Sequence, residues 1–206
     1  MPQITAIEPQ KKDKTRFNIY IDGEFAFGLD AENLAKEKLQ AGQKISNDTI
    51  NQLIVLNEFV KVYDKVLRFL SYRPRSKKEI ENYLKKQQVG SRVSGLVFDK
   101  LAKYNYLNDY QFAKWWTANR LRFRPKGKNI LKAELIKKGI SRQIIEQVLE
   151  KVSPNLQEEI ALAVARKQIT KYKNLKQAEV LKKLTSFLAR RGFNWETISD
   201  VISRLK

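Results

Sequence analysis

The sequence contains no cysteine and no histidine. These absences exclude disulfides, zinc sites built on thiolate or imidazole, cysteine nucleophiles, serine-histidine-aspartate triads and histidine acid-base catalysis. Only 8 glycines and 5 prolines stand among 206 residues, so few positions interrupt helices. No apolar run approaches the roughly 20 residues of a membrane span, and the first ten residues lack the basic-then-apolar order of a signal peptide. We therefore expect a mainly helical, cytoplasmic protein with no cofactor, no metal and no contact with a membrane.

Positive charge is what the chain has in excess. It holds 41 Lys and Arg against 22 Asp and Glu, for a formal charge of +19. Residues 1–50 carry seven basic and eight acidic residues, whereas residues 51–206 carry a net +20, which predicts a domain boundary near residue 50. Because 42% of the residues are apolar, the chain can form a core. A globular protein with this charge is expected to bind polyanions.

The first 50 residues are predicted to form a small β-containing extension. Arg16–Ile21 and Glu24–Leu29 alternate apolar and polar residues, and Asp22-Gly23 between them favours a tight type I′ hairpin turn. We further expect a strand over Gln3–Glu8 and a short helix over Asp30–Leu39 that ends at Ala41-Gly42.

A long helix is predicted to follow this extension. From Ser46 onward, apolar residues recur three and four positions apart, behind a Ser-Asn-Asp run that is typical of a helix N-cap. We expect the helix to stop near Tyr72, because Pro74 disfavours helical geometry at the residue before it.

The helical part of the sequence repeats itself. Leu70–Lys77 aligns without a gap with Leu121–Lys128 at an offset of 51 residues, and Leu135–Ile140 aligns with Leu188–Phe193 at an offset of 53. Each copy predicts three helices, of which the second is rich in Lys and Arg. We therefore predict a mainly α fold of three tandem three-helix, helix-turn-helix-like repeats in an elongated arc, preceded by the small β-hairpin and helix extension.

The repeats also predict domain boundaries and turns. The expected parts are the extension at 1–50, the long helix with the first repeat at 51–105, the second repeat at 106–152 and the third at 153–206, where helices resume near Leu156. Gly139 and Gly192 stand where a helix end needs a left-handed residue. The first copy has Gln88 at this position, so we expect it to lack the glycine turn.

Five segments occur in order along the helical part of the chain: Tyr72-Arg73-Pro74-Arg75-Ser76, Tyr106-Leu107-Asn108-Asp109, Arg124-Pro125-Lys126-Gly127, Lys138-Gly139-Ile140 and Phe187-Leu188-Ala189-Arg190-Arg191-Gly192-Phe193. Taken together, they resemble the bacterial RecX family over about residues 60–205. Asn108 departs from the family pattern, because it stands where the family tends to have an acid.

The resemblance implies a non-enzymatic regulator of the RecA recombinase, active in recombination, DNA repair and the SOS response. Proteins of this family are three tandem three-helix repeats that bind within the helical groove of the RecA filament on DNA. They limit its ATPase, strand-exchange and co-protease activities. We expect a monomer that binds the RecA filament and, weakly and without sequence preference, single- or double-stranded DNA. The rival interpretation is a DNA-binding protein of helix-turn-helix type that acts without RecA.

Basic residues recur around the second helix of each copy and predict a cationic strip for a nucleic acid or an acidic protein groove. The alternative interpretation is a solvated helix face. We refer to the following residues as the basic strip: Arg73, Arg75, Lys77, Lys78, Lys85, Lys86, Arg124, Lys126, Lys128, Lys132, Lys137, Lys138, Lys182, Lys183, Arg190 and Arg191.

Structural roles compete with binding roles at other positions. In Arg73-Pro74 and Arg124-Pro125, the proline is expected to fix the start of the second helix and the arginine to cap the helix before it. Trp115 and Trp116 could stack on unpaired bases, but their helical spacing favours a core position for at least one of them. We expect Trp195 to anchor the last helix by packing.

No catalytic residue is predicted. Asp22, Glu24 and Asp30 cluster in the hairpin region, but a metal-dependent nuclease needs acids that converge on a divalent ion, and no matching acid pair recurs elsewhere. The sequence also has no GxxxxGK[ST] phosphate loop, so we do not expect ATP hydrolysis.

Overall fold

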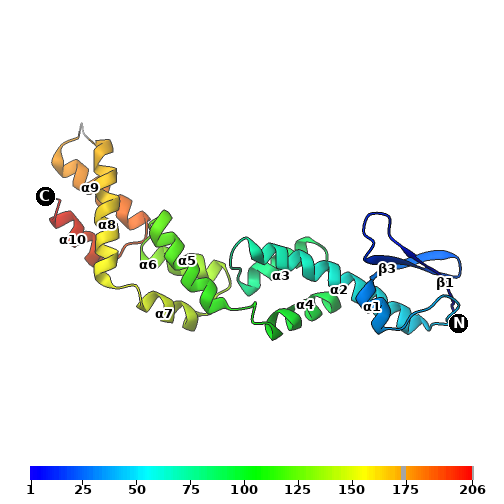
Figure 1. The fold of residues 1–206 in the computed structure, drawn as a ribbon. Helices are drawn as coiled ribbons and strands as arrows, with labels where there is room; N and C mark the ends of the chain where they lie inside the picture. The colour runs from blue at the N-terminus through cyan, green and yellow to red at the C-terminus, as the bar shows by residue number, and fades with distance from the viewer. Residues whose placement is uncertain (173–174, 206) are drawn as a thin grey trace. The chain divides into compact units, whose positions relative to one another are not determined.

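The computed structural model describes residues 1–172 and 175–205 and is mainly helical (Figure 1). A small N-terminal sheet precedes three three-helix units, which confirms the predicted fold class. None of the helices in the described residues combines the length and the apolar character needed to cross a membrane. The elements are β1 (Ile4–Pro9), β2 (Arg16–Ile21), β3 (Glu24–Asp30), α1 (Ala31–Lys36), α2 (Asn47–Ser71), α3 (Lys77–Lys86), α4 (Ser91–Lys103), α5 (Asp109–Phe123), α6 (Lys128–Lys137), α7 (Arg142–Glu150), α8 (Pro154–Ile169), a short 3-10 helix (Thr170–Tyr172), α9 (Gln177–Arg190) and α10 (Trp195–Ser203).

Two compact units make up the chain. The N-terminal unit comprises Met1–Arg73 and Tyr83–Tyr106, and the C-terminal unit comprises Pro74–Asn82 and Leu107–Lys206. Helix α3 therefore begins in the C-terminal unit and ends in the N-terminal unit.

The sheet of the N-terminal unit is an antiparallel meander in the order β1-β2-β3. Asp22 and Gly23 have φ values of 51° and 88°, as a type I′ turn requires, so the predicted hairpin is confirmed. Buried Ile19 and Leu29 belong to an apolar cluster that also includes Leu53 of α2. The sheet and the start of the long helix thus share one core, as the sheet beside α2 in Figure 1 illustrates.

Helix α1 is shorter than predicted. It begins after Asp30, whose carboxylate accepts a hydrogen bond of 2.8 Å from the amide of Asn33, but it ends at Lys36 rather than at Ala41-Gly42. Lys38 has a φ of 49°, a left-handed conformation that cannot continue a right-handed helix. The helix therefore stops before the sequence offers a glycine.

Helix α2 agrees with the prediction at both ends. The Ser46 hydroxyl accepts a hydrogen bond of 3.1 Å from the amide of Thr49, and the helix stops at Ser71. It packs against α4, and both helices contribute buried side chains. Phe69 of α2 stacks on Tyr83 in the C-terminal half of α3, with 4.4 Å between the ring centroids. These contacts bring the three helices of the first repeat together.

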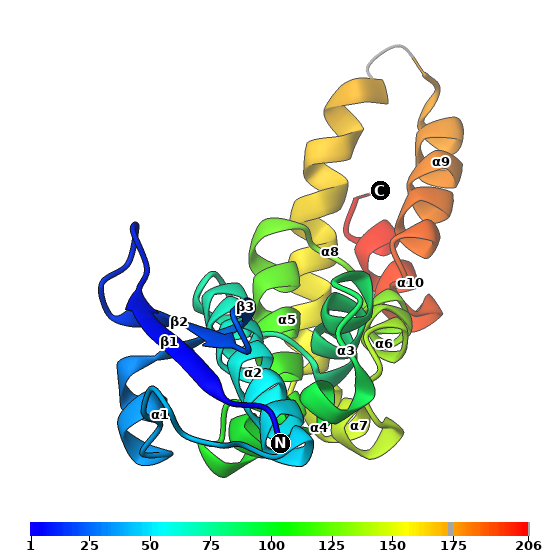
Figure 2. The ribbon, with the colours of Figure 1, turned by 90° about the vertical axis from the view of Figure 1, so that its right-hand side faces the viewer.

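The C-terminal unit contains one apolar cluster for each remaining repeat. Phe112, Leu131 and Ile145 come from the three helices α5, α6 and α7 of the second repeat. Ala161, Leu184 and Ile198 come from α8, α9 and α10 and belong to the apolar cluster of the third repeat. Figure 2 shows α8 and α9 side by side.

Helix α8 begins two residues before the predicted Leu156. Its first residue is Pro154, and the hydroxyl of Ser153 accepts a hydrogen bond of 3.2 Å from the amide of Leu156. A proline fits the first helical position because the missing amide has no partner within the helix there. The Ser-Pro-Asn run is therefore a helix start and not a linker.

All three second helices end in the same left-handed turn. Gly139 and Gly192 have φ values of 80° and 82°, which confirms the prediction for the last two copies. The first copy has the turn as well, because Gln88 adopts a φ of 56°. The Gln88 amide donates a hydrogen bond of 3.0 Å to the carbonyl oxygen of Lys85. The Val89 amide donates one of 3.1 Å to the carbonyl oxygen of Leu84. The first copy therefore departs from the others in lacking the glycine, as expected, but it keeps the left-handed turn and its backbone hydrogen bonds.

Candidate partner-binding surface

The basic strip divides into exposed and partly buried residues. The partly buried members are Arg73, Arg75, Lys126, Lys128, Lys138 and Arg191. The exposed members are Lys77, Lys78, Lys85, Lys86, Arg124, Lys132, Lys137, Lys182, Lys183 and Arg190.

Two of the partly buried members have structural roles. The Lys138 ammonium lies 2.5 Å from a carboxylate oxygen of Glu79, and the two side chains are only 28% and 13% exposed. The Arg191 guanidinium donates to the carbonyl oxygen of Pro125 at 3.1 Å and lies 4.8 Å from the centre of the Phe187 ring. Lys138 and Arg191 therefore connect segments of the C-terminal unit, a role beyond the partner binding predicted for them.

The start of α3 is held by residues of the second repeat. Buried Ser76 donates a hydrogen bond of 2.8 Å to the carbonyl oxygen of Lys138, and its hydroxyl also accepts from the amide of Glu79 at 3.2 Å. The amide of Lys77 donates to a carboxylate oxygen of Asp109 at 2.9 Å. Two amides without a partner inside the first turn of α3 are thus satisfied, that of Lys77 by the second repeat and that of Glu79 by Ser76.

The start of α6 is held in the same way by the third repeat. The amide of Gly127 donates to the carbonyl oxygen of Arg191 at 2.8 Å, and the amide of Asn129 donates to that of Gly192 at 3.2 Å. The amide of Lys128 donates to the side-chain oxygen of buried Gln157 at 3.1 Å. At both junctions, the beginning of one second helix meets the end of the next.

Glycine is required at the second junction by close approach. A methyl group at Gly127 would lie 2.0 Å from the carbonyl oxygen of Gly192, and one at Gly192 would lie 2.7 Å from the amide nitrogen of Ile130. Ser76 occupies the position equivalent to Gly127 in the first copy, where its side chain makes the contact instead. The junctions involve helix ends, whereas Lys132, Lys182 and Lys183 are exposed within α6 and α9.

Neither proline stands where the sequence suggested. α3 begins at Lys77 and α6 at Lys128, so Pro74 and Pro125 lie in the preceding loops rather than in the first helical turn. The capping role predicted for the arginine is confirmed for Arg124, which is the C-cap residue of α5. The junction contacts, and not the prolines, fix where the second helices begin.

The two adjacent tryptophans have packing roles. Trp115 and Trp116 are half-buried against the apolar cluster of the second repeat. The indole nitrogen of Trp116 donates to a carboxylate oxygen of Glu134 at 2.8 Å, and the Arg120 guanidinium donates to the same oxygen at 2.7 Å. The prediction that one of them is in the core thus holds only in part, since both pack and neither is fully buried.

Trp195 does not anchor the last helix. Its side chain is 72% exposed. It is the first residue of α10, before the buried stripe that begins at Thr197 and Ile198, so the core ends before reaching it. The prediction of a packing anchor is wrong.

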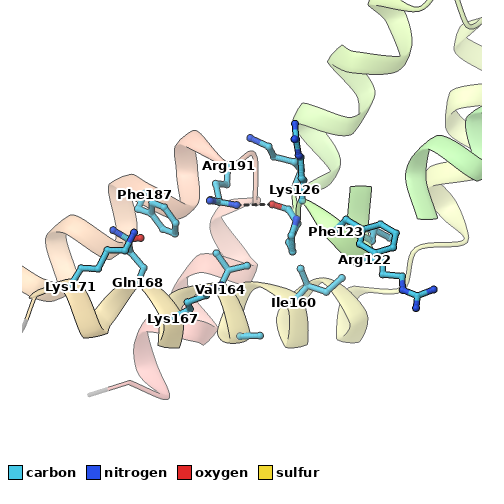
Figure 3. Close-up of a pocket in the computed structure, with 14 residues that line it drawn as sticks. Arg122, Phe123, Lys126, Ile160, Val164, Lys167, Gln168, Lys171, Phe187 and Arg191 are labelled. Atoms are coloured by element: carbon cyan, nitrogen blue, oxygen red, sulfur yellow. Dashed lines mark hydrogen bonds between the residues drawn. The ribbon is translucent and has the colours of Figure 1, made fainter. Parts of the chain in front are cut away.

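A groove in the C-terminal unit adds basic residues that sequence reasoning missed. The end of α5 and the loop after it face α8 and α9 across this groove (Figure 3). It brings Arg124, Lys126 and Arg191 of the basic strip together with Arg122, Lys167 and Lys171. The last three lie on first helices or just after one, whereas the predicted basic strip follows the second helices and the segments before them. The signal was present in the alternation of cations with Phe123 after Leu121.

In residues 1–172 and 175–205, the acidic side chains form no group of three or more that could hold a metal ion, and this includes Asp22, Glu24 and Asp30.

Four family models match consecutive parts of the chain. The Regulatory protein RecX N-terminal domain matches residues 2–46, and the first, second and third RecX three-helix domains match residues 63–101, 108–149 and 156–202. The chain belongs to the RecX family.

Curated RecX proteins and solved RecX structures agree with this assignment. The chain is 35% identical over 206 residues to the regulatory protein RecX of Bacillus subtilis (strain 168), which covers 100% of this chain and 78% of that protein. It is 34% identical over 194 residues to the regulatory protein RecX of Listeria welshimeri, with 94% and 72% covered. A crystal structure of regulatory protein RecX shares 26% identity with a TM-score of 0.78, with 98% of each chain covered. A crystal structure of RecX from Lactobacillus salivarius is 27% identical to this chain, with a TM-score of 0.65. The match covers 73% of this chain and 97% of the chain in that crystal structure.

The departure of this RecX-family chain at Asn108 leaves the local structure intact. Asn108 is the N-cap of α5, and its side-chain oxygen accepts a hydrogen bond of 2.9 Å from the amide of Gln111. Asparagine and aspartate are both favoured at this position because either side chain offers an acceptor oxygen. The cap needs the oxygen and not the negative charge.

Proposed function

We propose that the protein regulates the RecA recombinase by binding within the helical groove of the RecA filament on DNA. There it limits the ATPase, strand-exchange and co-protease activities of the filament. Membership of a family of regulatory proteins supports this function. The structural observation that supports it most is that exposed basic residues follow the second helices of all three repeats, while the helix ends are taken up by the junctions.

The proposed mechanism is occupancy rather than chemistry. The residues available at this surface are lysines and arginines, which attract the negative charge of a nucleoprotein filament. Bound along neighbouring subunits, the protein obstructs the entry of a duplex or the subunit motions that ATP turnover requires. We propose that it acts as a monomer and catalyses no reaction itself.

Direct DNA binding is the second candidate function. Three-helix units are also the framework of helix-turn-helix proteins, and a net charge of +20 in residues 51–206 supports binding to phosphates. A pull-down with RecA from nuclease-treated extract separates the two candidates, since only the regulator retains RecA without DNA.

The test of the regulatory function is the DNA-dependent ATPase of RecA. Wild-type protein is expected to suppress turnover at or below one molecule per RecA subunit. The variant K85A/K86A/K137A/R190A removes four exposed charges of the basic strip and should inhibit several-fold less, whereas Lys138 and Arg191 are left intact because they hold the junctions.

A matched control removes the same charge elsewhere. K11A/K12A/K14A/K44A changes four exposed lysines of the N-terminal region and should inhibit like the wild type. Unchanged RecA turnover with excess wild-type protein would contradict the proposed function. Equal weakening by the two quadruple variants would show that net charge, and not the strip, governs inhibition.

A further inference from the structure

Six basic residues line the groove between α5, α8 and α9. Arg122, Arg124 and Lys126 line it on the α5 side, with Lys167, Lys171 and Arg191 opposite, and no lining residue is acidic. The groove has a volume of about 690 Å³ and lies entirely within the C-terminal unit. Six cations without a neutralising carboxylate repel one another, so the lining is arranged for an anionic ligand.

Aromatic rings stand among these cations. Phe123 ends α5 with 65% of its surface exposed, and the Arg122 guanidinium lies 5.1 Å from its ring centre. Phe187 lines the groove from α9 with Arg191 against its ring, as Figure 3 shows. A phenyl ring left in water beside cations offers a flat face on which a nucleic-acid base can stack.

Part of the groove wall formed by α8 is apolar. Ile160, Ala163 and Val164 line it between the basic residues, and Figure 3 shows Ile160 and Val164 directed toward the groove. A base or sugar can therefore rest against α8 while its phosphates meet the surrounding cations.

These features favour a single-stranded nucleic acid over the alternatives. In a duplex, paired and stacked bases cannot present a face to Phe123. An acidic peptide would neutralise the six cations but would leave the exposed Phe123 ring without a role. Cations that track a backbone, together with aromatic faces for bases, are the combination by which proteins bind single strands without sequence preference.

We propose that this groove binds single-stranded DNA, with its phosphates on the six cations and one base stacked on Phe123. The proposal deepens the proposed function, because it names the component of the RecA–DNA filament that this face contacts. Its test uses DNA without RecA, so that the two proposals can fail separately.

The experiment measures binding of a fluorescent oligothymidylate by anisotropy over a salt series. K167A/K171A removes two exposed lysines that line the groove and should weaken binding about tenfold. Because each phosphate contact with a single strand contributes about 0.7 to the slope of log K against log salt, the slope should fall by about 1.4. K114A/K176A removes two exposed lysines of the same unit outside the groove and should change affinity less than twofold.

Phe123→Leu separates stacking from charge. It should weaken oligothymidylate binding at least fivefold, as expected for the loss of one stacked base, without changing the salt slope or the affinity for a duplex. Equal losses for K167A/K171A and K114A/K176A would overturn the proposal, because the charge of the whole protein would then suffice. Tighter, groove-dependent binding of a polyglutamate peptide of equal charge would overturn it in favour of an acidic protein segment. Normal RecA inhibition with no contrast among these variants would overturn the groove assignment alone.

Discussion

The ammonium group of Lys138, at the end of α6, forms an ion pair with Glu79, which lies 59 residues earlier in the first turns of α3. The same lysine is 4.8 Å from the ring centre of Trp116, and its carbonyl oxygen accepts the hydroxyl proton of Ser76. Lys138, a residue of the basic strip, therefore connects the second repeat to the start of α3 in the first repeat. Removing a charge from this strip has different consequences at neighbouring positions.

Lys138→Ala is expected to lower the free energy of unfolding by about 1.5 kcal/mol. This value is at the low end for a hydrogen bond between charged groups, because the side chains of Lys138 and Glu79 both remain partly exposed. Lys137→Ala changes an exposed side chain and should stay within about 0.5 kcal/mol of the wild type. Urea unfolding followed by circular dichroism measures both. Equal stabilities for the two variants would mean that the Glu79 ion pair contributes nothing.

The two glycine turns should respond differently to alanine. Gly139→Ala forces a left-handed alanine, at a cost of about 1–2 kcal/mol, and its methyl group would also lie 2.7 Å from the Cβ and Cδ atoms of Lys78, a side chain and not backbone. Gly192→Ala carries the same backbone cost and also collides with Ile130, so at least about 3 kcal/mol is expected. Thermal unfolding of the two variants measures the difference. A milder effect at Gly192 than at Gly139 would contradict the close packing of the second junction.

Gln88→Gly should stabilise the protein. A left-handed residue other than glycine costs about 1–2 kcal/mol, which the substitution removes. Glycine also loses more backbone entropy on folding, which lowers the stability by roughly 0.5–1 kcal/mol. The net gain is expected to be about 0.5 kcal/mol, which a urea titration can resolve. Gln87→Gly is the control, because this neighbouring residue is not among those with a positive φ and the same substitution there should destabilise.

Deletion of residues 1–50 should leave most of the C-terminal unit folded and destabilise the N-terminal unit. The deletion removes Ile19 and Leu29, which pack in one cluster with Leu53, and so exposes the first half of α2. Leu107–Leu205 retains its own apolar clusters and its junction between the second and third repeats. Circular dichroism should show a smaller cooperative transition, and hydrogen exchange should show loss of protection in α2. Full protection of α2 in the shortened protein would show that the sheet is dispensable.

Local features were predicted well because they depend on a few neighbouring residues. The hairpin at Asp22-Gly23, the Ser46 cap and the left-handed turns at Gly139 and Gly192 each follow from the conformational preferences of single residues. The three-helix repeats follow from apolar spacing, which reports the buried face of a helix wherever that helix lies. Errors arose where a local signal had to compete with distant contacts, as at Pro125, where the third repeat and not the proline sets the start of α6.

The sequence by itself determined the fold class, the repeat register, the charge of the repeats and their resemblance to the RecX family, because composition and periodicity are properties of the chain alone. Only the tertiary structure decided which basic residues remain available. Lys137 and Lys138 are identical neighbours in the sequence, yet helix rotation exposes the first and directs the second to Glu79. Arg122, Lys167 and Lys171 lie in different segments and line one groove only in the tertiary structure.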